Sequence, residues 1–216
     1  MADKGLSYAS LKKVRSLLHQ LYVYADINDL VDKNIAAHLS IGKNKPVYPH
    51  KPFTRAQVNR LWSCPHPDAD LLLIMLYTGM RSAELRNLKR SDIKIKQKYI
   101  NITRSKTKAG IRMIPIHPRI WPLVERRLSD GTKYLISDDL MTYAQLAGRC
   151  RAVLKLIRCQ HTTHDCRHTF ATWLDNAGAN YNAKRRLLGH AANNVTDGVY
   201  THKALTQLRA AIKLLK

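Results

Sequence analysis

The sequence is poor in acidic residues, and this shortage sets the first limits on its function. Its 216 residues include 15 Asp or Glu, only two of them glutamates, against 37 Lys or Arg, so the net charge is +22. Such an excess of one sign repels itself and suits a protein that sits on a polyanion. We therefore expect a nucleic-acid partner; basicity that serves solubility or ribosome association is the alternative.

Long apolar runs and cysteine pairs are also scarce. The longest apolar run, residues 71–77, is far shorter than the roughly 20 residues that a membrane helix needs, and residues 1–5 lack the apolar stretch of a secretory signal. The four cysteines form no CxxC pair and are too few for a disulfide framework. We expect a reduced, intracellular protein with no membrane contact.

One cluster of metal-binding residue types needs a separate judgement. Cys159, His161, His164 and Cys166 fall within eight positions. Zinc ligands usually form pairs that a dozen or more residues separate, so four ligands this close, leading into a helix, cannot easily surround one ion. The GxxxxGK[ST] pattern of nucleotide-binding loops is absent. We expect no metal and no cofactor.

The chain divides at a proline-rich stretch. Residues 41–52 contain three prolines and one glycine with little periodicity, which is typical of a linker. Residues 1–50 hold seven Lys or Arg and four Asp or Glu, which leaves +19 of the net charge for the rest. Helical spacing predicts a helix over 7–24, capped by Ser7, and a shorter one over 26–39. Two helices are too few for an independent domain.

The remainder predicts a mainly α domain with a small antiparallel β-sheet (α+β). Alternation and β-branching over 93–103 and 111–116 predict strands, with residues 108–110 as a turn. Helical patterns, capping residues and turn glycines predict the helices, which cover 54–62, 67–78, 81–88, 118–128, 143–157, 163–176, 182–188 and 203–215.

Three segments carry groups suited to cutting a DNA strand without a metal. That reaction needs fixed cations for the charge that develops on phosphate, a nucleophile and a proton donor. In segment 78–85, Arg81 leads a helix and Glu84 follows on the same face; an ordinary surface ion pair is the alternative. In segment 164–172, His164 and Arg167 can face one anion, or the histidine only caps the helix.

The third segment places His190 at a helix end and Tyr200 ten residues later. Taken alone, Tyr200 could equally be a half-buried packing residue, since the chain has ten tyrosines.

In order, these residues resemble the catalytic domain of the tyrosine recombinases, the phage-type integrases. The resemblance runs from about Thr54 to the C-terminus, in the order Arg…Lys…His-x-x-Arg…His…Tyr, and rests on Thr-Gly-Met-Arg-Ser-Ala-Glu-Leu, His-Asp-Cys-Arg-His-Thr-Phe-Ala-Thr and Leu-Leu-Gly-His. The N-terminal residues are similar to the end of a core-DNA-binding domain in integrases of conjugative transposons and phages. The implied organisation is 1–45 for part of that domain, 46–53 for a linker and 54–216 for the catalytic domain.

The resemblance also implies a role for each site residue. Arg81 and Arg167 would clamp the phosphate oxygens, and Tyr200 would attack phosphorus to leave a 3′-phosphotyrosine. Lys106 would protonate the leaving oxygen, with Lys108 as the alternative acid. His164 would assist proton transfer at the nucleophile, His190 would donate a hydrogen bond to the phosphate, and Glu84 would support the site by orienting its neighbours. The residues expected to contact the DNA backbone are Arg104, Arg112, Lys108, Lys184, Arg185 and Arg186; for Arg185 and Arg186, facing water is the alternative.

The implied activity is site-specific recombination that integrates or excises a mobile element. Its partner would be double-stranded DNA, bound as a tetramer by a protein that is a monomer when free. The protein would be bacterial or phage-encoded, cytoplasmic and associated with the nucleoid. Residues 1–50 supply only about two of the four or five helices of the usual core-binding domain, so the chain is either a fragment or a naturally short protein. The last helix would dock on a neighbouring subunit or on its own chain. Two other functions stay open: DNA relaxation like that of a type IB topoisomerase, and a DNA-binding regulator without activity.

Overall fold

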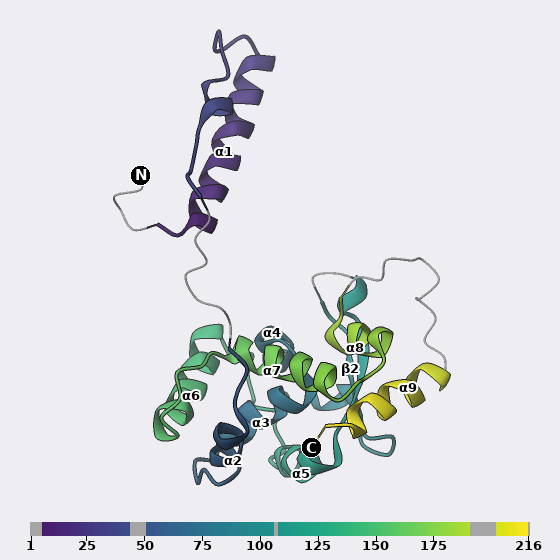
Figure 1. The fold of residues 1–216 in the computed structure, drawn as a ribbon. Coiled ribbons are helices and arrows are strands. Elements are labelled where there is room, and N and C mark those ends of the chain that lie inside the picture. The colour runs from purple at the N-terminus through teal and green to yellow at the C-terminus, as the bar shows by residue number, and fades with distance from the viewer. Residues whose placement is uncertain (1–5, 44–50, 106–107, 191–201, 216) are drawn as a thin grey trace. The chain divides into compact units, whose positions relative to one another are not determined.

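The computed structural model describes residues 6–43, 51–105, 108–190 and 202–215, and the chain divides into two compact units, residues 1–49 and 50–216 (Figure 1). Within the described residues, no helix has both the length and the apolar character needed to cross a bilayer. The elements, with η for short 3₁₀ helices, are α1 (Tyr8–Ile27), η2 (Ile35–His38), α2 (Arg55–Trp62), α3 (Ala69–Thr78), α4 (Ser82–Arg86), η3 (Arg90–Asp92), β1 (Ile93–Lys94), β2 (Tyr99–Ile102), η4 (Lys108–Gly110), β3 (Arg112–Pro115), η5 (Pro118–Ile120), α5 (Trp121–Ser129), α6 (Tyr143–Leu156), α7 (Thr163–Asn176), α8 (Tyr181–Leu188) and α9 (His202–Lys213).

The first unit consists mainly of the long helix α1. The hydroxyl of Ser7 caps its first turn, as the sequence predicts. The helix ends at Asn28, and Asp29 follows with φ 54°, a conformation that asparagine and aspartate tolerate better than most residues. The predicted second helix over 26–39 is therefore wrong, because this break takes its first residues and only the 3₁₀ turn Ile35–His38 forms.

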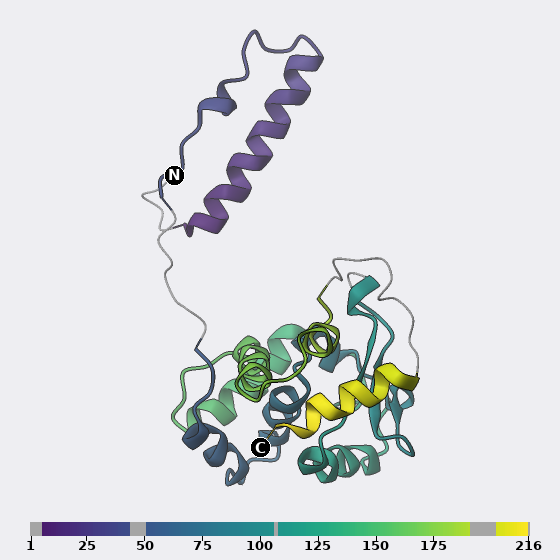
Figure 2. The same cartoon turned by 45° about the vertical axis from the view of Figure 1, so that its right-hand side comes forward.

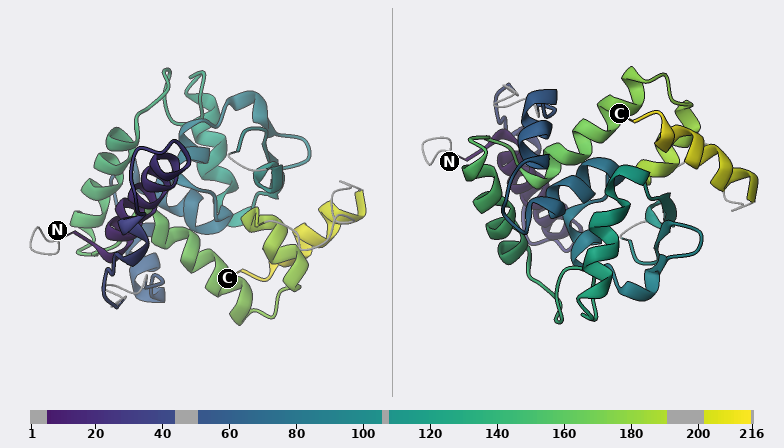
Figure 3. Two further views of the ribbon diagram at one scale, coloured as in Figure 1. Left: turned by 90° about the horizontal axis from the view of Figure 1, so that it is seen from above. Right: turned by 90° about the horizontal axis from the view of Figure 1, so that it is seen from below.

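The second unit is built around α3. All ten residues of this helix are buried, and it packs against α2, α5, α6 and α7. Figures 1 and 3 show α6 and the strands on opposite sides of the unit, and Figure 2 shows α9 running past α8 on the strand side. The mainly α architecture with one small antiparallel sheet, which the sequence predicts, is confirmed.

The sheet has the order β1-β2-β3, and both pairs are antiparallel. In the register, Ile100 lies opposite Ile114, and Ile102 lies opposite Arg112. All four of these residues are buried, so the inner face of the sheet carries one guanidinium beside its isoleucines. That guanidinium belongs to the candidate site described below.

The C-terminal helix packs on its own chain. α9 contacts α8 and β3, and Leu208, Ala211, Ile212 and Leu215 are buried on that side. The last described residue, Leu215, gives its carbonyl oxygen to Nε2 of His117 at 3.1 Å. The structure thus shows docking in cis, one of the two arrangements that the sequence leaves open.

Acid is expected to destabilise the fold around His117. The Nε2–H of His117 donates to Leu215, while its Nδ1 accepts from the backbone N–H of Arg119 at 3.1 Å, which only the neutral imidazole can do. Burial lowers the pKa of His117; the bond to Leu215 opposes this shift and the charge of Arg119 adds to it. The folded protein therefore binds fewer protons than the unfolded chain, and the free energy of unfolding should fall as the pH drops through about 6.5.

Urea unfolding at about pH 7.5 and about pH 5.5 measures this loss. His117→Gln is the matched control, because an amide can still donate to Leu215 but does not titrate. We expect the variant to lose less stability on acidification than the wild type; equal losses would show that His117 is not responsible.

Candidate active site

A single carboxylate organises the site. Glu84 lies in α4, one turn after Arg81, and it accepts the backbone N–H of Arg81 at 2.8 Å and its guanidinium at 3.0 Å. On its other side, Glu84 receives two nitrogens of Arg112, each at 2.9 Å. Burial alone would raise the pKa of Glu84, but Arg112 and then Arg81 lower it overall, so the group is an anion between two cations.

The position of Arg112 corrects the prediction that it contacts the DNA backbone. Only 3% of this residue is exposed, and its guanidinium is occupied by Glu84, by the carbonyl oxygen of Leu187 at 2.7 Å and by that of Gly110 at 2.8 Å. A buried guanidinium with four hydrogen bonds inside the protein is not available to a phosphate outside it. Its place on the inner face of β3 is the reason.

Arg167 is the third guanidinium of the site. It is 6% exposed, and it donates to the carbonyl oxygen of Gly79 at 2.9 Å and to that of Leu188. These two carbonyls lie at the ends of α3 and α8, where the helix dipoles place negative charge. Arg167 therefore holds α7 against both helix ends.

The pKa of Arg167 reflects its burial and the charges of the neighbouring Arg81 and Arg112. Burial, followed by the charges of Arg81 and Arg112, lowers the pKa of Arg167 to about 10, against the opposing effect of Glu84. One carboxylate therefore faces three guanidiniums, which leaves a surplus of positive charge that an anion would neutralise.

His190 follows this cluster in the chain. Gly189 ends α8 with φ 62°, and a Cβ there would lie 3.0 Å from Nη1 of Arg112 and 3.2 Å from the carbonyl oxygen of Ala109, so glycine allows the close approach. His190 itself is exposed. Partial desolvation is the largest cause that lowers its pKa, and the charges of four cations lower the pKa further. The neutral imidazole is therefore the form present at neutral pH. The four cations are Arg167, Arg81, Arg185 and Lys184.

The basic residues of α8 flank this end of the site. Lys184 forms an ion pair with Asp175 at 2.6 Å and, like Arg185, lies over the ring of Tyr181. Arg185 and Arg186 are half-buried. Their predicted contacts to DNA stay predictions.

The remaining catalytic candidates differ in what the structure says of them. His164 is exposed in the first turn of α7, one turn before Arg167, with its ring 4.7 Å from that of His168. Lys106 and Tyr200 lie outside the described residues, as does the side chain of Lys108.

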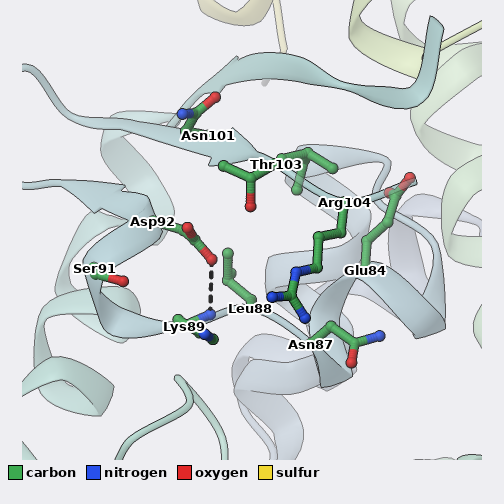
Figure 4. Close-up of a pocket in the computed structure, with 10 residues that line it drawn as sticks. Glu84, Asn87, Leu88, Lys89, Ser91, Asp92, Asn101, Thr103 and Arg104 are labelled. Carbon is green, nitrogen blue, oxygen red and sulfur yellow. Dashed lines mark hydrogen bonds between the residues drawn. The ribbon is translucent and has the colours of Figure 1, made fainter. Parts of the chain in front are cut away.

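A polar pocket of about 170 Å³ lies beside Glu84 (Figure 4). Arg104, which the sequence places among the DNA contacts, is exposed, and its side chain points across the pocket toward Asn87. Lys89 and Asp92 lie at the far wall, where the backbone N–H of Lys89 donates to the Asp92 carboxylate at 3.1 Å. Arg104 is thus an accessible cation next to the arginine cluster.

The described residues contain no group of three or more His, Cys, Asp and Glu side chains that could hold a metal. In the cluster considered above, Cys166 is fully buried and His161 stacks on Phe53 with ring centroids 3.9 Å apart. Their places in the core and at the start of α7 account for them structurally.

The arrangement defines a class of site. The side chain of Arg81 is 40% exposed, Arg167 is 6% exposed, and neutral His190 follows the end of α8 whose Leu188 carbonyl binds Arg167. A phosphodiester at this point would meet two guanidiniums and an imidazole. Planar guanidiniums in fixed positions suit the charge that builds up on phosphate oxygens during strand transfer. A mainly α domain with this site belongs to the class of enzymes that break and rejoin phosphodiesters.

Comparison with known proteins identifies the family. Residues 51–207 match the Phage integrase family. Tyrosine recombinase XerA of Thermococcus kodakarensis is 31% identical over 234 residues, covering 98% of this chain and 77% of that protein. The transposase of transposon Tn916 from Enterococcus faecalis is 24% identical, covering the whole chain and 64% of the transposase. The Tn1549 transposon integrase with circular intermediate DNA shares the fold, with TM-score 0.75 and 24% identity over 97% of this chain and 80% of that one.

The chain therefore belongs to the phage integrase family and contains a tyrosine recombinase catalytic domain. It is a site-specific recombinase, of the class that cleaves and religates DNA. The resemblance that the sequence motifs indicate is confirmed.

Proposed function

We propose that this chain cleaves one DNA strand at a time with Tyr200 and rejoins it to a different strand, so that a mobile element is integrated or excised. The phenol oxygen of Tyr200 bonds to phosphorus, and the bond from phosphorus to the 5′ oxygen breaks. The products are a 3′-phosphotyrosine and a free 5′-hydroxyl. Because the new linkage conserves the energy of the broken one, reversal by another 5′-hydroxyl completes the exchange.

One observation carries this proposal: Arg81 and Arg112 bind Glu84, and the charges of all three act on Arg167, so the cluster has more positive charge than the carboxylate neutralises. In this mechanism Arg81, the more exposed of the two, binds a non-bridging oxygen directly, and Arg167 binds the other. His190, neutral at pH 7 because its pKa is lowered, donates a hydrogen bond to the same phosphate.

Two further groups move protons. Lys106 gives a proton to the leaving 5′ oxygen, with Lys108 as the alternative, and His164 takes part at the phenol. His164 is suited to this by its exposed position one turn from Arg167.

Outside the active site, the surplus of basic side chains binds the DNA backbone. Arg104 beside the pocket and the Lys184–Arg186 run of α8 are the contacts that we propose, since all lie near the arginine cluster. Residues 1–45 contact the duplex as part of a core-binding domain. Four copies assemble on paired sites, and the protein acts on DNA in the cytoplasm. Support for a DNA partner comes from the similar Tn1549 and lambda integrase structures, which are described with bound DNA.

The test is the capture of the covalent intermediate. A library of nicked duplexes, in which the short fragment that bears the free 5′-hydroxyl dissociates after cleavage, should yield a protein–DNA species that survives denaturation. Mass spectrometry of its peptides should find the nucleotide on Tyr200, and Tyr200→Phe should form no such species. A DNA-bound wild-type protein without a covalent species, or a Tyr200→Phe variant that still forms one, would overturn the proposal.

A further inference from the structure

The guanidinium of Arg112 makes four hydrogen bonds in the site, although it is buried and cannot reach DNA. Its Nε donates to the carbonyl oxygen of Leu187 at 2.7 Å and its Nη1 to that of Gly110 at 2.8 Å, while Nη1 and Nη2 together hold both oxygens of Glu84. Three segments far apart in the chain therefore meet at one guanidinium.

Each of these segments carries a catalytic candidate. Gly110 ends η4 just before β3, and Lys106 and Lys108 precede it in the sequence between β2 and β3. Leu187 is three residues before His190, and Gly189 between them packs against Arg112 and Ala109 so closely that a Cβ would lie 3.0–3.2 Å from both. Glu84 holds Arg81.

We propose that Arg112 is a positioning residue, which keeps the turn carrying the proton donor in register with the phosphate-binding arginines and His190. This inference rests on the proposed function. Arg112 touches neither DNA nor the reacting atoms; it acts through the Gly110 carbonyl on the turn and through Glu84 on Arg81. A lysine would keep the charge but cannot bind the carboxylate in bidentate fashion and reach both carbonyls as well.

Changing the leaving group distinguishes loss of the proton donor from loss of a phosphate-binding group. In a duplex whose cleaved linkage has sulfur in place of the 5′ oxygen, the phosphorus–sulfur bond breaks and a thiolate leaves, which needs no proton from the enzyme because a thiolate is a weak base. Loss of the proton donor is then harmless, whereas loss of a phosphate-binding group is not. The readout is the ratio of single-turnover cleavage rates for the sulfur and oxygen duplexes, using the nicked sequence that gives the covalent species.

For Arg112→Lys we expect oxygen-duplex cleavage to fall about 100-fold, the typical size of a lost general acid, and the sulfur-to-oxygen ratio to rise at least about ten-fold. Lys106→Ala and Lys108→Ala set the scale, because the one that removes the acid gives the largest ratio. Arg167→Lys is the matched control, since a phosphate-binding cation matters for both duplexes and the ratio should stay near that of the wild type.

Gly189→Ala disturbs the packing between Gly189 and Arg112 without removing any charge. Its Cβ would press on Arg112 and Ala109 from the side of α8, and we expect the ratio to rise in this variant too, with the helical circular dichroism and the cooperative urea transition retained. A ratio that stays within about three-fold of the wild type in both folded variants would overturn the proposal. A wild-type protein that forms no covalent species on any duplex would refute the proposed function instead, so the two failures are distinguishable.

Discussion

Arg167→Met is expected to lower single-turnover strand cleavage by about 100-fold or more, because it removes a preorganised donor for the charge that builds up in the transition state. Arg81→Ala is expected to lose a similar factor for the same reason. The two arginines differ in their surroundings, since the side chain of Arg81 is 40% exposed and Arg167 is 6% exposed. The two substitutions should therefore change the free energy of unfolding for different physical reasons.

For Arg167, two opposing effects on stability nearly balance. Removing the guanidinium leaves the Gly79 and Leu188 carbonyl oxygens without a donor, at about 1–3 kcal/mol each. Against this, a pKa lowered from 12.5 to about 10 means that burial and neighbouring cations disfavour the charged form by about 3 kcal/mol. We expect Arg167→Met to change the free energy of unfolding by no more than about 2 kcal/mol, although a buried residue is lost.

For Arg81→Ala, the expected loss in the free energy of unfolding is small. Glu84 keeps its two bonds from Arg112, and a half-exposed ion pair contributes less than about 1 kcal/mol. Urea unfolding and single-turnover cleavage on the same preparations measure both quantities. Arg126→Ala is the control: it removes a cation of α5 that pairs with Asp70 of α3, and it should leave cleavage unchanged. A folded Arg167→Met protein that cleaves within about ten-fold of the wild type would show that Arg167 does not bind the phosphate.

The sequence was sufficient to predict the local structure wherever a local signal decides it. Thr54 begins α2 with the expected capping box, since its hydroxyl and the side chain of Gln57 bond each other's backbone N–H groups. Gly79 ends α3 in the left-handed conformation. The helix predicted over 26–39 does not form, because Asn28 and Asp29 favour a turn and end α1 there. The prediction gave more weight to helical spacing than to these two turn-forming residues.

In the site, the sequence predicted the pairs that lie within one helical turn but not those that the fold creates. The Arg81–Glu84 pair follows from its spacing and is confirmed at 3.0 Å. The bond of Glu84 to Arg112 joins residues 28 positions apart, and the carbonyl partners of Arg167 lie on α3 and α8, so no local pattern indicates them. One signal was available: Arg112 alternates with Ile114 and Ile116, which are buried, and therefore belongs to the inner face of its strand.

Gly79→Ala is expected to be the most destabilising small change in the catalytic domain. Gly79 has φ 63°, where an alanine costs about 1–2 kcal/mol. Its Cβ would also lie 2.2 Å from the ring of Phe170, which is fully buried and cannot move without disturbing the core, and such overpacking costs about 1–3 kcal/mol more. The total of about 2–5 kcal/mol corresponds to a fall in the melting temperature on the order of 10 °C.

Gly178→Ala isolates the clash from the backbone strain. Gly178 ends α7 with φ 67°, nearly the same conformation, but a Cβ there has no atom within 4 Å. We expect it to lose only the strain, about 1–2 kcal/mol, and to cleave DNA normally. Gly79→Ala should also cleave more slowly at temperatures where it is folded, because the Gly79 carbonyl that must shift is one of the two that hold Arg167 in place. If the two alanine variants melt at the same temperature, the ring of Phe170 yields more easily than its burial indicates, and the Gly79 carbonyl does not constrain Arg167.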